Sequence, residues 1–296
     1  MQKVLLVHCE FDFGLCEVIL TVFRETLTTD KRSIVKSSLN MTSSSEQKSN
    51  NATQYSALQS KMQFKGGCLL NIKPGHKILD MGCGTGELTR FLAELVGENG
   101  EVVGVDPDKE RIRVAKENLA DLPNVTVQVG DSVSGFPHAN EAYYDLHFSS
   151  HAFHWLSLDE RPEYVKKAFE SLKPQGLVAI QSDATQDDDI YRRIKESYNS
   201  KSTNTAPKVT FVEEQGVKAL LARYNFSDVE TKLVNDCSYF DSFDDFAAWW
   251  SASAYTDINE LPDKQVLEDL KKKIILSDGR VKMTMKLIQV KGRKDF

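Results

Sequence analysis

The stretch Lys77-Ile-Leu-Asp-Met-Gly-Cys-Gly-Thr-Gly-Glu-Leu-Thr89 decides the fold of this chain. Its apolar start suits a buried strand, and residues 87–95 have the pattern of an amphipathic helix. Between them, Gly82, Gly84 and Gly86 predict a tight turn. Such a turn lets backbone N–H groups approach a ligand closely at the positive end of the helix. The stretch therefore predicts a strand, a ligand-binding turn and a helix in immediate succession.

The spacing of these glycines argues against two common nucleotide sites. A dinucleotide-binding turn has a glycine where Glu87 stands, and a phosphate loop ends in Gly-Lys-Ser/Thr, which this turn lacks. Asp80 directly precedes the turn, where a carboxylate would repel a pyrophosphate but would suit an amine or a sulfonium. The stretch therefore favours S-adenosylmethionine over NAD as the ligand.

Size and composition indicate a soluble globular protein. The 296 residues suffice for one large α/β domain with an insertion or a small cap. Hydrophobic residues at 41% and charged residues at 27% are ordinary for such a domain. The formal net charge is −6 and the only basic run is Lys271–Lys273, so nucleic acid is not an expected partner. Five cysteines without a CxxC pair indicate reduced thiols and a cytoplasmic location.

Residues 1–50 differ from the rest of the chain. Their apolar runs are interrupted by acidic residues and fit neither a signal peptide nor a membrane span. Residues 28–51 are rich in Ser, Thr, Lys and Asn, which predicts disorder, and Met41 is a plausible alternative start. We therefore expect a non-core extension at residues 1–50 and one folded domain at residues 51–296, acting as a monomer or homodimer without a membrane partner.

Strand and helix patterns alternate along the folded part. One or two helices are expected at residues 53–71, before the first strand. The further expected strands are residues 101–105, 125–129, 144–149, 177–181, 229–234 and 281–290. The further expected helices are residues 108–120, 159–172, 187–198, 211–224, 242–250 and 262–275. This alternation predicts a mostly parallel sheet with helices on both faces. Residues 72–182 would form a cofactor-binding half, and residues 183–296 the last strands and a helical lid.

Polar residues follow the first four expected strands. Asp80 ends the first, Asp106 the second, Asp131-Ser132 the third and Ser149-Ser-His151 the fourth. Ligands of parallel sheets bind at these strand ends. Asp106 lies about 20 residues beyond the glycine turn, where an acidic residue accepts ribose hydroxyls, and Asp131 is placed to accept from an adenine amino group. The same aspartates also suit strand-end turns and helix caps.

Four motifs in this order resemble the class I S-adenosylmethionine-dependent methyltransferases. They are Leu79-Asp-Met-Gly-Cys-Gly-Thr-Gly86, Val103-Gly-Val-Asp-Pro107, Val129-Gly-Asp131 and Leu172-Lys-Pro-Gln-Gly176. The resemblance implies a Rossmann-like, seven-stranded sheet whose last strand, residues 281–290, is antiparallel. It also implies cofactor contacts from these motifs and strand ends, at Asp80, Gly82, Cys83, Gly84, Gly86, Asp106, Pro107, Asp131, Ser132 and Ser149.

The segment Ser149-Ser-His-Ala-Phe-His-Trp-Leu156 bears on the substrate class. It lacks the Pro-Pro-Tyr/Phe/Trp turn of nucleic-acid amino methyltransferases. Its His-Trp pair resembles the juvenile-hormone-acid and trans-aconitate methyltransferases, which act on small carboxylic acids. That resemblance implies that Trp155 and a glutamine, Gln63 or alternatively Gln59, hold the substrate carboxylate. His154 would be a second donor, or a base if the nucleophile is a hydroxyl.

Other interpretations of these residues remain open. His147, His151 and His154 share no helical face and have no carboxylate cluster beside them in the sequence, so no metal site is expected. Cys83 suits a small side chain packed behind the glycine turn. The sequence therefore predicts a methyltransferase that O-methylates a small carboxylic acid. The alternatives are C-, N- or hydroxyl-O-methylation of another metabolite, or a non-catalytic partner subunit that binds the cofactor.

Overall fold

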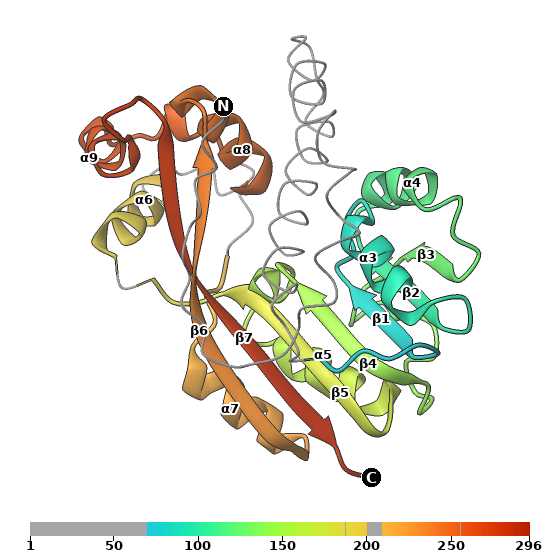
Figure 1. Ribbon diagram of the computed structural model, residues 1–296. Coiled ribbons are helices and arrows are strands. Elements are labelled where there is room, and N and C mark those ends of the chain that lie inside the picture. The colour runs from blue at the N-terminus through green and yellow to red at the C-terminus, as the bar shows by residue number, and fades with distance from the viewer. Residues whose placement is uncertain (1–69, 187, 200–208, 255) are drawn as a thin grey trace, which may run out of the picture. The chain divides into compact units, whose positions relative to one another are not determined.

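The computed structural model describes residues 70–186, 188–199, 209–254 and 256–296, whose strands form one sheet (Figure 1). The strand order is β3-β2-β1-β4-β5-β7-β6. The strands are β1 (Lys77–Met81), β2 (Glu101–Asp106), β3 (Val125–Val129), β4 (Tyr144–Ser150), β5 (Leu172–Asp183), β6 (Phe226–Phe240) and β7 (Val281–Lys294). The first five pair in parallel, whereas β7 is antiparallel to both β5 and β6. The expected seven-stranded sheet with an antiparallel last strand is confirmed.

Helices lie in the connections between these strands, except between β3 and β4. They are α3 (Glu87–Val96), α4 (Lys109–Asn118), α5 (Arg161–Ser171), α6 (Asp189–Asn199), α7 (Glu214–Arg223), α8 (Phe243–Ala254) and α9 (Lys264–Ile274), with short 3-10 helices η1 (Phe153–Trp155) and η2 (Ile258–Glu260). Each of the seven α-helices falls where the sequence predicted one, shifted by a few residues at the ends. No helix of the described residues is both long and apolar enough to cross a bilayer.

Several expectations fall on residues outside the described ranges. They concern the extension at residues 1–50, the start at Met41, the helices expected up to residue 69, and the two candidate glutamines, Gln59 and Gln63. These expectations stay predictions.

The two faces of the sheet carry separate apolar cores. Neighbouring residues of β1 show this, because side chains of a strand alternate between its faces. Ile78 packs with α3, in a cluster that includes Leu92 and Phe148, whereas Leu79 packs with α5 and α7, in a cluster that includes Tyr164. Helices therefore cover both faces of the central strands and fix the strand ends where a ligand would bind.

A third core forms the lid. Helices α6, α8 and α9 pack around the far ends of β6 and β7, at the upper left of Figure 1. Phe246 of α8 is completely buried there and contacts the rings of Phe240, Trp249 and Trp250. The indole N–H of Trp250 donates to the Thr256 hydroxyl at 3.2 Å. These aromatic side chains are thus mainly the core of the lid.

Three strands, β5, β6 and β7, differ from the sequence-based expectation, and β7 ends at Lys294, four residues after the expected end. β5 begins at Leu172, five residues before the expected start, and includes the Pro174-Gln-Gly176 turn as an irregularity with Gln175 at φ 67°. The pairing with β4 shifts register between Tyr144 and Leu146, which accommodates this irregularity. β6 spans 15 residues because it pairs with β7 along nearly its whole length. These extensions come from long-range pairing, which local sequence patterns do not contain.

Leu92→Ala on α3 is expected to lower the free energy of unfolding by about 2–5 kcal/mol, because the side chain is 2% exposed in a packed core. Leu95→Ala on the same helix is the matched control. Leu95 is 41% exposed, so its removal is expected to cost less than about 0.5 kcal/mol. Urea denaturation of both variants measures the difference, and equal losses would contradict the assignment of α3's buried face.

Candidate functional site

The glycine turn between β1 and α3 takes a backbone shape that only glycine adopts readily. Gly82, Gly84 and Gly86 have φ values of 82°, 57° and 92°. A Cβ atom on Gly82 would lie 2.3 Å from the Cβ of Ala152, in the loop after β4. The absence of side chains at these positions therefore brings the β4 loop directly against the turn. The two predicted ligand-binding segments are neighbours in space.

The turn is held to β2 by hydrogen bonds. The amides of Gly82 and Cys83 donate to the carbonyl oxygen of Val105, at 2.7 and 3.0 Å. The carboxylate of Asp106 accepts from the amide of Gly84 at 3.0 Å and from the amide of Asp108 at 2.9 Å. Burial raises the pKa of Asp106, while Arg111 and the two amides oppose this. Asp106 thus lies beside the turn, and its contact with a ribose stays a prediction.

The side chains of Cys83 and Pro107 do not point to a direct chemical role. Cys83 is buried, and burial raises the pKa of its thiol well above the ordinary value. Its Sγ lies 3.1 Å from where a Cβ atom of Gly104 would stand. It therefore packs behind the turn, and any ligand contact would come from its backbone. Pro107 is exposed at the end of β2 and has no N–H to donate.

Asp80 is a buried carboxyl without a cationic partner in the described part of the chain. It is 1% exposed and accepts a hydrogen bond from the Thr89 hydroxyl at 2.7 Å. Burial raises the pKa of Asp80 to about 7; Thr89 opposes the rise, and the nearby charge of Asp106 adds to it. A positively charged ligand group at the turn would supply the missing counter-charge. This fits the sulfonium and ammonium of S-adenosylmethionine.

Asp131 and Ser132 form a turn at the end of β3. One carboxylate oxygen of Asp131, Oδ1, accepts from the amides of Val133 and Ser134 at 2.7 and 2.5 Å. Asp131 therefore stabilises the turn after β3, which is the alternative role that the sequence analysis gave for these aspartates. This role occupies one of its two carboxylate oxygens. Ser132 is buried, as is Ser149 at the end of β4. Contacts of these three residues with adenine or cofactor stay predictions.

His154 lies on η1, is 5% exposed, and has its ring against the end of β5. Its Nδ1 is 3.2 Å from the Ser182 hydroxyl and accepts from the amide of Asp183 at 3.4 Å. Burial lowers the pKa of His154, although Asp183 opposes this, so the ring is neutral at neutral pH. An amide can only donate, so Nδ1 accepts in this contact, and in the corresponding neutral tautomer Nε2–H is a donor.

Asp183, which the sequence did not place in the site, lies beside His151 of the fourth strand end and beside His154. The Nδ1 atoms of His151 and His154 lie 3.5 and 3.8 Å from Oδ1 of Asp183. Burial would raise the pKa of Asp183, but the two histidines together hold it below its ordinary value. His151 also has φ 54°, which is unusual for a residue with a side chain. The expected fifth strand ended at residue 181, so its real end at Asp183 was missed.

His147, the third histidine considered in the sequence analysis, lies in the core and away from His151 and His154. His147 is fully buried between the rings of Phe136 and Tyr164, and burial lowers its pKa to about 3. Trp155, in contrast, is beside His154, with ring centroids 5.2 Å apart. The structure thus brings Trp155, His154 and His151 together and leaves His147 in the core. Whether Trp155 and Gln63 hold a carboxylate stays a prediction.

Asp80 gives a test of ligand charge. A cationic ligand favours the ionised form of a carboxyl whose pKa is about 7, so binding releases a proton below that pH. The affinity for S-adenosylmethionine is expected to rise about fivefold to tenfold from pH 6 to 7.5, measured by calorimetry. Asp80→Asn should bind more weakly and lose this increase, and the comparison cancels any titration of the ligand itself. Parallel pH profiles of the two proteins would contradict the role of Asp80.

Comparisons with known proteins agree with this geometry. Residues 78–176 match the family model described as "Methyltransferase domain". Trans-aconitate 2-methyltransferase of Deinococcus radiodurans is 28% identical over 163 residues, which are 54% of this chain and 58% of that protein. Demethylmenaquinone methyltransferase of Staphylococcus aureus is 32% identical over 116 residues, or 37% and 44% of the two chains. The chain thus spans about half the length of these curated relatives.

Solved structures share the fold. The YcgJ protein from Bacillus subtilis superimposes with a TM-score of 0.59 at 17% identity, over 81% of this chain and 99% of that one. The phosphoethanolamine N-methyltransferase 2 of Haemonchus contortus, crystallised with S-adenosyl-L-methionine, gives a TM-score of 0.52 at 16% identity, over 81% and 52% of the two chains. These structures show the fold, and residues 78–176 with their glycine turn are similar to the methyltransferase domain of class I S-adenosylmethionine-dependent methyltransferases.

Proposed function

We propose that the protein transfers the methyl group of S-adenosylmethionine to a carboxylate oxygen of a small organic acid. The observation that carries this proposal is the neutral, buried His154, whose remaining polar atom is a donor, with the indole of Trp155 beside it. A carboxylate is already ionised at neutral pH and needs donors that hold it, not a base that deprotonates it. The similarity to trans-aconitate 2-methyltransferase over 54% of the chain supports the same substrate class.

The chemistry requires little beyond orientation. The bound cofactor supplies a methyl group on a positively charged sulfur. One carboxylate oxygen forms the new C–O bond as the C–S bond breaks, and the bonding pair returns to sulfur, giving a methyl ester and S-adenosylhomocysteine. The chain's own residues hold the acceptor in line and exclude water, which is where most of the rate originates. His154 Nε2–H and the Trp155 indole N–H are the donors we assign to the second carboxylate oxygen.

A second candidate has its own support in the His151–Asp183 pair. A histidine oriented by a carboxylate 3.5 Å away is an arrangement that accepts protons efficiently. It suits an acceptor that must lose a proton, such as a hydroxyl or an amine. This candidate differs from the first in needing a base, so the two can be separated experimentally.

The test measures transfer of a labelled methyl group to a panel of fatty, terpenoid and tricarboxylic acids. Ester formation predicts label that is released by mild base. Trp155→Phe is expected to lower kcat/KM about tenfold or more through loss of one hydrogen bond to a charged group, with unchanged cofactor affinity. Label that resists base in every product would reject the carboxylate proposal.

His151→Asn separates the two candidates in the same assay. If the acceptor is already ionised, His151→Asn is expected to change kcat/KM by less than about threefold, because no proton has to be removed. A hydroxyl or amine acceptor predicts a loss of about 10²-fold or more, because a general base is removed. As a control, calorimetry with S-adenosylhomocysteine tests whether Trp155→Phe and His151→Asn still bind at the cofactor site.

A further inference from the structure

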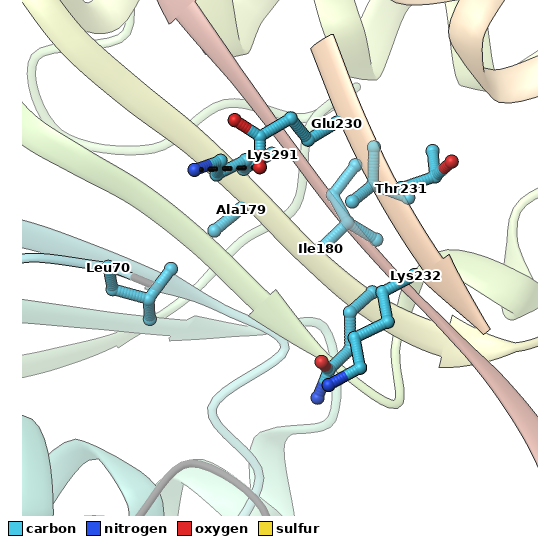
Figure 2. A pocket seen from close by; sticks show the side chains of 9 residues that line it. Leu70, Ala179, Ile180, Glu230, Thr231, Lys232 and Lys291 are labelled. Carbon is cyan, nitrogen blue, oxygen red and sulfur yellow. Dashed lines mark ion pairs between the residues drawn. The ribbon is translucent and has the colours of Figure 1, made fainter. Parts of the chain in front are cut away.

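Two cations near the sheet differ in how their charge is compensated. Lys291 lines a cavity of about 280 Å³ and pairs with Glu230 at 3.0 Å, which is the dashed line in Figure 2. Arg161, the first residue of α5, is 6% exposed and forms no ion pair with a carboxylate in the described residues. Burial lowers the pKa of its guanidinium, and the charge of Glu213 opposes this. A buried charge is costly unless other groups stabilise it, so the contacts of Arg161 indicate its role.

The Arg161 side chain is held by an aromatic ring and a carbonyl group. Its guanidinium carbon lies 5.0 Å from the centre of the Phe153 ring, which is buried on η1. One guanidinium nitrogen, Nη2, donates to the carbonyl oxygen of Thr210. Both contacts favour a cation, so they offset part of the cost of burying the charge. Arg161 thus joins α5 to η1 and to the segment that precedes α7.

The segment Thr210–Val212 connects two residues of the candidate site. The amide of Thr210 donates to the carbonyl oxygen of His154 at 2.8 Å. The amide of Val212 donates to the carbonyl oxygen of Asp183 at 2.9 Å. One short segment therefore holds the backbones of both His154 and Asp183, and Arg161 holds that segment through the carbonyl of Thr210.

The charge of Arg161 also acts on the His154 ring. The other titratable groups that act on this ring are Asp183, at the end of β5, and His151, in the loop after β4. Burial lowers the pKa of His154; Asp183 opposes this, and the charges of His151 and Arg161 add to the lowering. Arg161 therefore favours the neutral ring in addition to its hold on the backbone.

We propose that Arg161 is a positioning residue of the acceptor site, which holds Thr210–Val212 in place and so fixes the direction in which the His154 ring meets the acceptor. This rests on the proposed function, in which an N–H of His154 contacts the acceptor carboxylate. Arg161 acts through the backbone and not by touching the acceptor. Misplacing a positioned group by about 1 Å costs up to about 10²-fold in rate, so loss of Arg161 lowers kcat without weakening cofactor binding.

Hydrogen exchange of the full-length protein, followed by NMR, tests this hold directly. Arg161→Met is expected to speed exchange of the Thr210 and Val212 amides about tenfold or more through loss of a charged hydrogen bond, while the Leu79 amide in β1 is unchanged. The same variant is expected to raise the pKa of His154, because a nearby positive charge is removed. Arg161→Lys keeps the charge, so its pKa of His154 stays low and its exchange rates lie between those of the other two proteins.

Transfer of labelled methyl to the acids of the panel gives the second readout. Arg161→Met is expected to lower kcat about tenfold or more, with an unchanged affinity for S-adenosylhomocysteine, and Arg161→Lys to recover part of the loss. Arg223→Met is the matched control. Arg223 also lies beside an aromatic ring, 5.9 Å from the centre of the Tyr224 ring, but it is exposed at the end of α7, so its loss should change neither quantity.

Three results would overturn the positioning role. Wild-type exchange and wild-type kcat in Arg161→Met, with methyl esters still formed, would reject it and leave the proposed function standing. Equal acceleration of the Thr210, Val212 and Leu79 amides would show general destabilisation in its place. Absence of ester formation by the wild-type protein with every acid would overturn the proposed function as well. If Arg161→Met does not fold, Arg161→Lys decides: faster exchange at Thr210 and Val212 alone supports the role, and wild-type rates reject it.

Discussion

The carboxylate of Asp106 is the contact on which the rest of the site depends. It is buried at the end of β2 and accepts amide hydrogens from Gly84 and Asp108, which ties the glycine turn to the neighbouring strand. A buried carboxylate is costly unless it is hydrogen-bonded, and these amides would otherwise lack partners. The same interaction thus fixes the shape of the turn and leaves a carboxylate at its edge.

Negative charge at the turn is only partly compensated by the described residues. Burial raises the pKa of both Asp80 and Asp106; Arg111 opposes the rise at Asp106, whereas the charge of Asp106 adds to the rise at Asp80. A folded protein tolerates this arrangement because Asp80 can be half protonated near neutral pH. The ionised form of Asp80 is therefore incompletely stabilised in the protein without ligand. A cationic ligand would stabilise it, which explains the preference for such a ligand.

The sequence predicted the parts of this site that local patterns encode. β1, β2, β3 and β4 begin and end within about one residue of the expected positions, because each is a short apolar run bounded by turn residues. The ends of β5 and β6 were not predicted, since their length comes from pairing with β7. Asp183 was missed for that reason, and with it the pairing of His151.

The same long pairing explains why cofactor and acceptor sites are built differently. The cofactor turn needs only β1, β2 and the loop after β4, which are close in sequence. The end of β5 that carries Asp183 pairs with β7, and Gln181 and Gln289 form a hydrogen bond across this pair although they are more than 100 residues apart in the sequence (Figure 1). Substitutions in β6 and β7 can therefore alter the acceptor without disturbing the turn.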